Sequence, residues 1–198
     1  MKAAEHHAAF TEPEMVGALL RSLDGHGYLS SPSMCCALRL LPLIFLRPGE
    51  LRHMEWSWVD LDEKLIRVPA HAMKMKEEHL VPLSWQAAQI LRDLAQHGRG
   101  PFVLAGKKYR KPIGENALND ALGRMGYPEQ PTAHMFRTIA SRLLREALGE
   151  QDEVIELQLA NRGRNKVKAP YDPAERLDDR RAMMQRWSDY LAELKTTM

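Results

Sequence analysis

The hydrophobic pattern of the chain changes period once, and that change limits the folds that the chain can adopt. Between residues 56 and 82, short runs rich in β-branched and aromatic residues replace apolar residues at helical spacing. The runs Trp56–Val59, Leu65–Val68 and His79–Val81 are separated by turn-like segments such as Leu61–Lys64, which is typical of a small antiparallel sheet. The remaining pattern predicts helices, so we expect a mainly α fold with one small antiparallel β-sheet, of the α+β type.

Capping residues, glycines and prolines mark the helix boundaries. Thr11–Glu14 has the form of a capping box with a proline in the first turn, and Gly25 to Gly27 end that helix. Ser31 and Ser84 each precede a further helix. The expected later helices cover about residues 32–46, 48–54, 84–97, 114–125, 132–148, 151–160 and 173–195. The sequence has no internal repeat, which indicates one domain over residues 11–198 and an N-terminal tail or linker over residues 1–10.

Composition excludes several classes of protein. Hydrophobic residues make up 44% and charged residues 27% of the 198 residues, which is ordinary for a globular domain. No run of about 18 apolar residues occurs and the N-terminus lacks the apolar core of a signal peptide, so we expect a cytoplasmic protein without a membrane partner. Cys35 and Cys36 are adjacent and indicate reduced thiols. The histidines at 6, 7, 71 and 79 lack metal-ligand spacing, so we expect no metal site.

Charge is informative through its distribution. The net charge of +2 is only mildly basic, but two clusters and Lys76 could neutralise DNA phosphates. Each cluster is explained equally well as a solvated loop. The first cluster surrounds Tyr109 and comprises Lys107, Lys108, Arg110 and Lys111, and the second comprises Arg162, Arg164, Lys166 and Lys168.

Three short motifs carry side chains suited to phosphate chemistry. Arg47 directly precedes Pro48 at a helix start, where unpaired N–H groups favour anions and a guanidinium can grip a phosphate through two parallel hydrogen bonds. Lys74 lies in the turn before the third strand. His134 and Arg137 are three residues apart and share one face of a helix. Taken singly, each motif is more often part of an ordinary surface.

Two further residues complete an ordered set. Asn161 stands at the end of an expected helix, and Tyr171 follows in a loop. Tyrosine recombinases of the phage integrase family carry an arginine on a short helix, a β-hairpin lysine, H-x-x-R, a histidine or tryptophan, and a nucleophilic tyrosine. From about Thr11 to Leu194, the chain resembles the catalytic domain of this family, and its motif text is similar to integrases of satellite prophages and genomic islands. The matching residues, in family order, are Arg47, Lys74, His134, Arg137, Asn161 and Tyr171.

The resemblance implies DNA cleavage and rejoining without a metal or other cofactor. Tyr171 would attack a backbone phosphate and leave a 3′-phosphotyrosyl link, which the 5′-hydroxyl of a partner strand would then attack to reseal the DNA. Arg47 and Arg137 would clamp the non-bridging oxygens. Lys74 would protonate the leaving 5′-oxygen, and His134 would help to take the phenol proton or hold the phosphate.

Three positions near these residues qualify the resemblance. Glu50 occupies a position whose acidic residue braces the site in the family. Asn161 stands where relatives have histidine or tryptophan; its amide can donate a hydrogen bond but cannot carry a proton. Pro170 precedes the expected nucleophile and stiffens that loop. The alternatives left open are a catalytically impaired DNA-binding or assembly relative and a nicking and closing activity like that of type IB topoisomerases.

The resemblance also implies partners. They are double-stranded DNA attachment sites, accessory DNA-bending proteins, and further copies of the chain in a homo-tetramer on DNA that forms through the C-terminal segment. Without DNA we expect a monomer. The apolar stripe of the last expected helix could be core or a docking face for a neighbouring protomer. The sequence starts just before the catalytic domain, so we expect the arm-binding and core-binding domains of full-length relatives to be absent and DNA binding to be weak.

Overall fold

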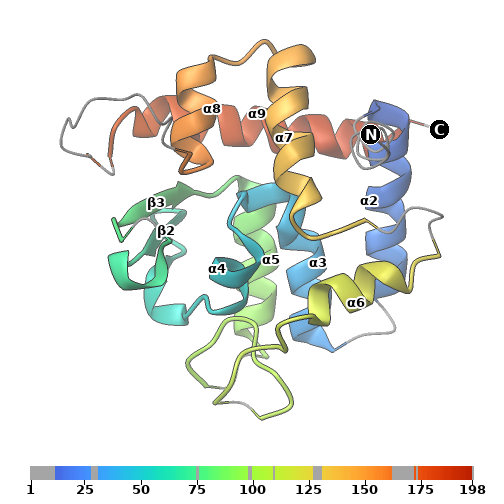
Figure 1. Cartoon of the computed structure of the whole chain (residues 1–198), viewed down its shortest axis with the longest axis vertical. Coiled ribbons are helices and arrows are strands. Elements are labelled where there is room, and N and C mark those ends of the chain that lie inside the picture. Colours follow the sequence, from blue (N-terminus) through green and yellow to red (C-terminus); the bar gives the residue numbers. More distant parts are fainter. Residues whose placement is uncertain are drawn as a thin grey trace.

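The computed structural model describes residues 12–27, 31–74, 76–97, 100–108, 110–126, 131–161, 172 and 174–197. In these ranges, most of the molecule is helical and one small sheet lies at its side (Figure 1). The helices are α2 (Pro13–Gly27), α3 (Pro32–Ile44), α4 (Pro48–Arg52), α5 (Trp85–Ala95), α6 (Ala117–Gly123), α7 (Met135–Glu146), α8 (Asp152–Gln158) and α9 (Leu177–Thr196). The expected mainly α fold with a small antiparallel sheet is confirmed. The expected tail over residues 1–10 lies outside the described residues.

The sheet has three antiparallel strands in the order β1-β2-β3. They are β1 (Val59–Asp60), β2 (Leu65–Val68) and β3 (His79–Pro82). Ile66 pairs with Val59 on one side and with Val81 on the other. Asp60 closes the first turn, because its carboxylate accepts hydrogen bonds from the N–H groups of residues 62 and 63 at 3.1 and 2.8 Å. The sheet lies at one side of the helical body, beside α4 and α5 (Figure 1).

The first predicted strand is wrong in its first part. Trp56–Trp58 form a 3₁₀ helix, η1, and the strand covers only the two residues of β1. The N–H of Trp56 donates to the carbonyl of Pro101 at 2.9 Å, and Glu55 pairs with Phe102 in an isolated bridge. The backbone ahead of β1 therefore pairs with the loop after α5 and not with β2. A local pattern of aromatic and β-branched residues carries no information on such a long-range partner.

α3 is the central helix and contacts α2, α5, α6, α7 and α9. It ends at Ile44, two residues earlier than expected, because Phe45 adopts a left-handed conformation with φ 55°. The ring of Phe45 packs edge-on against Trp187, with 5.8 Å between the centroids. This contact fixes the turn that leads from α3 to Arg47 and the start of α4.

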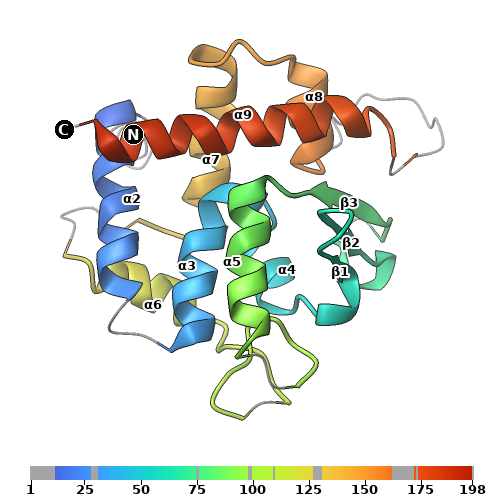
Figure 2. The ribbon, with the colours of Figure 1, turned by 180° about the vertical axis from the view of Figure 1, so that it is seen from behind.

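α9 crosses the back of the molecule and contacts α8, β3, α3 and α2 (Figure 2). Its apolar stripe is part of the main core, since Met183, Met184, Trp187 and Leu191 are at most 2% exposed. The indole Nε1–H of Trp187 donates to the carbonyl of Pro42 at 2.8 Å. Of the two interpretations of this stripe, the structure favours the core of the helix's own domain. None of the helices in the described ranges is long and apolar enough to cross a membrane.

Candidate functional site

The start of α4 holds Arg47 in a fixed orientation. Arg47 is the N-cap residue, with extended backbone angles, and Pro48 supplies the preset φ of the first helical position. Glu50, in the first turn, accepts from both ends of Arg47. Its Oε2 receives the backbone N–H of Arg47 and its Oε1 receives Nη1, each at 2.9 Å. Glu50 is only 6% exposed, so this charge-assisted contact is shielded from solvent and has the geometry that a bracing role requires.

Arg137 lies in the first turn of α7 and is buried, with 7% exposure. Its guanidinium donates to main-chain carbonyls of Phe45 and Leu159, the latter at 2.6 Å, and lies 3.4 Å from Oδ1 of Asn161. Burial and then the positive charge of Arg47 lower the pKa of Arg137 to about 10. The guanidinium nevertheless stays protonated at neutral pH.

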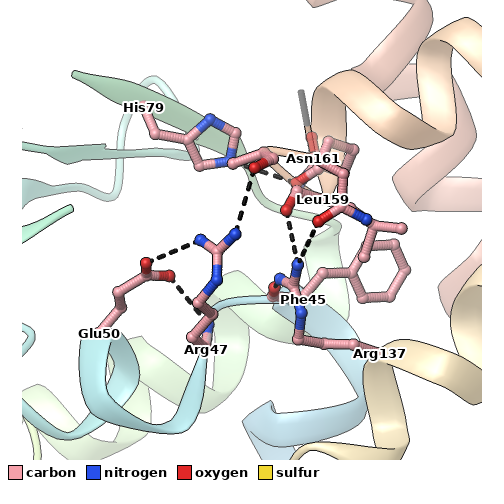
Figure 3. A network of polar contacts seen from close by, with 9 residues as sticks. Phe45, Arg47, Glu50, His79, Arg137, Leu159 and Asn161 are labelled. Carbon is pink, nitrogen blue, oxygen red and sulfur yellow. Dashed lines mark hydrogen bonds and ion pairs between the residues drawn. The ribbon is translucent and has the colours of Figure 1, made fainter. Parts of the chain in front are cut away.

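Both guanidinium groups meet at one short segment after α8 (Figure 3). Arg47 donates from Nη2 to the carbonyl of Ala160 at 3.2 Å, one residue beyond the Leu159 carbonyl that accepts from Arg137. Two positive charges thus lie close together, while the buried carboxylate of Glu50 contacts only Arg47 of the two directly. Main-chain carbonyls satisfy their hydrogen bonds but do not neutralise them. The arrangement is suited to a bound anion, and its forked donors match the oxygens of a phosphate.

The other expected site residues lie on the surface around this pair. His134 is exposed at the N-cap of α7, and its carbonyl accepts the N–H of Arg137 at 3.1 Å. Lys74 and Lys76 are exposed in the turn that precedes β3. In the described part of the chain, the hydrogen-bond network of Arg47 and Arg137 does not include Lys74. The structure therefore joins Arg47 to Glu50 and Arg137 to Asn161, and it brings both arginines to residues 159–161. Lys74 lies outside these contacts.

The expected DNA contacts fall into two groups. Lys107, Lys108, Arg110 and Lys111 are exposed in the loop between α5 and α6, which projects at the lower end of the molecule (Figure 1). The loop has its own order, since Gly106 N–H donates to the Lys111 carbonyl at 2.8 Å. The expected nucleophile Tyr171 and the basic residues Arg162 and Arg164 lie outside the described residues.

Sequence reasoning missed three polar residues beneath the site. His79, Gln158 and Arg180 are at most 2% exposed. The sequence pattern predicts that His79 begins a strand and is no metal ligand, but it does not reveal that this strand is buried on both faces. Any polar side chain there must find an internal partner. Among the described residues, no group of three or more His, Cys, Asp or Glu side chains could hold a metal ion.

Comparisons with known proteins agree on one family. The profile described as "Phage integrase family" matches residues 12–157. Prophage integrase IntZ of Escherichia coli (strain K12) is 36% identical over 184 residues, which cover 92% of this chain and 45% of that protein. The integrase of Enterobacteria phage P4 is 41% identical over 172 residues, covering 78% of this chain and 39% of that protein. The chain spans about half the length, or less, of these relatives.

Solved structures show the same fold. The XerA recombinase matches with a TM-score of 0.61 at 18% identity, covering 74% of this chain and 55% of that one. A lambda integrase dimer bound to a COC′ core site matches with a TM-score of 0.60 at 16% identity, covering 79% of this chain and 60% of that one. At such low identity these matches speak for the architecture alone.

Proposed function

Because the chain belongs to the phage integrase family, we propose that it cleaves and rejoins DNA in site-specific recombination, for the integration or excision of a prophage or genomic island. The observation that carries the proposal is the convergence of Arg47 and Arg137 on the segment after α8. Curated relatives that are 36% and 41% identical to the chain are a prophage integrase and a phage integrase.

The proposed reaction conserves the energy of the broken phosphodiester bond in a covalent phosphotyrosyl intermediate. The phenol oxygen of Tyr171 attacks a backbone phosphorus, and the bond from phosphorus to the 5′-oxygen breaks. His134 accepts the phenol proton or holds the phosphate, and Lys74 donates a proton to the leaving 5′-oxygen. The 5′-hydroxyl of a partner strand then attacks the phosphotyrosyl link and releases Tyr171. No nucleotide or metal cofactor enters this balance.

Arg47 and Arg137 stabilise the phosphate in this proposal. Charge develops on the non-bridging oxygens in the transition state, and fixed cations in a partly buried site act on it strongly. The carbonyls of Leu159 and Ala160 now accept hydrogen bonds from the two guanidinium groups. Phosphate oxygens would compete for the same donors. Glu50 keeps Arg47 in place while the acceptors change.

Asn161 serves as a hydrogen-bond donor to the phosphate. Its Oδ1 faces Nη2 of Arg137, and an arginine can only donate, so the amide nitrogen is directed away from Arg137. This orientation leaves the N–H groups for a ligand. The second candidate function, a catalytically impaired DNA-binding relative, is favoured by the same residue, because an amide cannot move a proton.

DNA attachment sites are the proposed substrate, and the loop of Lys107, Lys108, Arg110 and Lys111 supplies phosphate contacts. Arg162, Arg164 and Lys76 are further candidates for DNA contacts. Solved relatives include a lambda integrase dimer on a core site and a lambda integrase tetramer on a Holliday junction. By analogy, the chain assembles as a tetramer on DNA through its C-terminal segment, with accessory bending proteins, and is a monomer in the cytoplasm without DNA.

The decisive experiment traps the covalent intermediate. The chain is incubated with a nicked suicide DNA that carries the candidate attachment core, with magnesium chelated, beside Tyr171→Phe. We expect a protein–DNA adduct on a denaturing gel with the wild type and none with Tyr171→Phe. An adduct that survives in Tyr171→Phe, or that requires magnesium, contradicts the proposal. If neither protein forms an adduct, the test is repeated with the N-terminal domains of a relative fused ahead of residue 12 and with Asn161→His. Continued absence of an adduct favours the impaired relative.

A further inference from the structure

His79 lies beside the end of α8, next to the segment that the arginine pair contacts (Figure 3). It is the first residue of β3 and is 2% exposed. Its Nε2 lies 3.2 Å from the main-chain carbonyl of Gln158, the last residue of α8 (Figure 3). A carbonyl can only accept, so the hydrogen must be on Nε2 of His79. This geometry selects one tautomer of the ring.

The imidazole is held in its neutral form. Burial and then the positive charge of Arg180 lower the pKa of His79 to about 3, with smaller contributions from Arg137 and Arg47 in the same direction. The Gln158 carbonyl opposes this shift but does not reverse it. At the pH of a living cell His79 is therefore an uncharged hydrogen-bond donor, with its one ring proton on Nε2, and does not take up a second proton.

Arg180 grips the same glutamine from the other side. This residue of α9 is 1% exposed, and its Nε donates to Oε1 of Gln158 at 3.0 Å, while Nη2 donates to the Leu80 carbonyl. Since Arg180 has only donors, Oε1 of Gln158 must face it, and turning the amide over would set donor against donor. Nε2 of Gln158 consequently has no hydrogen-bond partner among the described residues. Gln158 is thus held by β3 at its main chain and by α9 at its side chain.

The three residues after Gln158 are the ones that meet the arginine pair. Leu159 accepts from Arg137, Ala160 accepts from Arg47, and Asn161 faces Arg137. Their positions follow from where α8 ends. We propose that His79 is a positioning residue of the cleavage site, which fixes the end of α8 through the Gln158 carbonyl so that residues 159–161 meet both guanidinium groups. This inference rests on the proposed function.

The test compares three variants with the wild type. His79→Ala removes the donor, and His79→Gln restores one, because the amide nitrogen of glutamine reaches about as far as Nε2 of histidine. His71→Ala is the control, since His71 is exposed in the 3₁₀ helix η2 (Ala70–Ala72). For each protein we would measure the unfolding temperature and the affinity for nicked core DNA. We would also measure the single-turnover rate of adduct formation from pH 6 to 9 and the hydrogen exchange of the peptide that contains residues 155–161.

We expect His79→Ala to slow adduct formation by about 10- to 100-fold, the range for a site displaced by a lost support, with DNA affinity changed by less than about 3-fold. Exchange at the end of α8 should rise. His79→Gln should recover most of the rate and protection with an unchanged pH profile, and His71→Ala should match the wild type.

Three results would overturn the inference. The first is a rate of adduct formation in His79→Ala equal to that of the wild type. The second is a His79→Gln variant that regains the wild-type unfolding temperature but not the wild-type rate. The third is a pH profile of the rate that loses a limb in His79→Gln, which would indicate proton transfer by His79. Failure of the proposed function is separate, because the wild type would then form no adduct. The exchange measurement would still report on His79 in that case, and unchanged protection in His79→Ala would refute its positioning role.

Discussion

Nη2 of Arg47 donates a hydrogen bond to the main-chain carbonyl of Ala160, 3.2 Å away, across 113 positions of the sequence. Ala160 presents this carbonyl from a left-handed backbone with φ 48°, a conformation that disfavours any residue with a Cβ. Backbone strain of this kind persists only where its surroundings impose it. At Ala160 those surroundings include the two arginines and the end of α8.

Replacing Ala160 by glycine tests this strain. A left-handed residue with a Cβ costs about 1–2 kcal/mol, which glycine would avoid. The greater freedom of glycine in the unfolded chain offsets about 0.4–1 kcal/mol of this gain in stability. We expect Ala160→Gly to raise the free energy of unfolding by about 0.5–1 kcal/mol, measured by urea denaturation. Ala140→Gly, in the middle of α7, is the matched control and should destabilise. An equal loss in both variants would show that Ala160 carries no strain.

Replacing Glu50 by glutamine tests the brace on Arg47. Glutamine has one acceptor where the carboxylate has two, so either the N–H or Nη1 of Arg47 would face an N–H group. We expect a loss of about 1–3 kcal/mol in stability and about a 10-fold slower single-turnover adduct formation. Glu63→Gln, on the exposed turn between β1 and β2, should leave both quantities unchanged. Wild-type rates in Glu50→Gln would remove Glu50 from the site.

The local features of this site could be predicted from the sequence. Pro48 after Arg47 marked the start of α4, and the spacing of His134 and Arg137 matches their places at the N-cap and in the first turn of α7. Such features depend on neighbours in the chain, which a pattern can report. The prediction of Tyr171 as nucleophile rests on the order of the motifs, and Tyr171 lies outside the described residues.

The burial of His79, Gln158 and Arg180 could not be predicted in this way. Their contacts join β3, α8 and α9, and positions 79 and 158 are brought together only by the tertiary fold. A polar residue at the first position of a strand is normally exposed to solvent. Here α9 lies against β3 and α8, and it contributes Arg180 to the same interior. The same limit explains η1, whose partner at Pro101 is remote in sequence.

The buried His79 predicts a specific acid sensitivity. The pKa of His79 is about 3 in the folded chain and about 6.5 in the unfolded chain. Below pH 6.5 the unfolded state therefore binds more protons than the folded state, so the stability decreases as the pH is lowered. This one group should cost roughly 2 kcal/mol between pH 7 and pH 5. Urea denaturation across this range should show a shallower decline for His79→Gln, with His71→Ala declining like the wild type. Parallel declines in all three proteins would mean that His79 is not buried in neutral form.

The basic loop between α5 and α6 predicts a salt dependence. If Lys107 and Lys108 contact phosphates, each contact releases counterions, and the slope of log affinity against log salt falls by about 0.9 for each contact removed. Lys107→Gln with Lys108→Gln should therefore reduce the slope by about 1.8, measured by fluorescence anisotropy on duplex DNA. Lys195→Gln, at the end of α9 beside Asp24, removes a charge away from this loop. Equal slopes for the double variant and the wild type would show that the loop is merely solvated.

The contacts of Trp187 hold α9 in the core of its own chain, and this can be tested. Its indole N–H donates to the carbonyl of Pro42. This carbonyl lies in the last turn of α3, where carbonyls have no partner within the helix. Trp187→Phe should lower the free energy of unfolding by about 2–4 kcal/mol, because it leaves a buried carbonyl unpaired and a cavity beside Phe45. Tyr190→Phe is the control for a nearby partly buried ring.

The unfolding of this variant separates two ways of using α9. If α9 packs within its own chain, the midpoint should not depend on protein concentration, and Trp187→Phe should lower it equally at every concentration. If protomers exchange α9 without DNA, the midpoint should rise with concentration in the wild type, since the core would then be completed by a second copy. The burial of Met183, Met184 and Trp187 in one chain favours the first behaviour. Any exchange of α9 on DNA would therefore have to begin by opening this core.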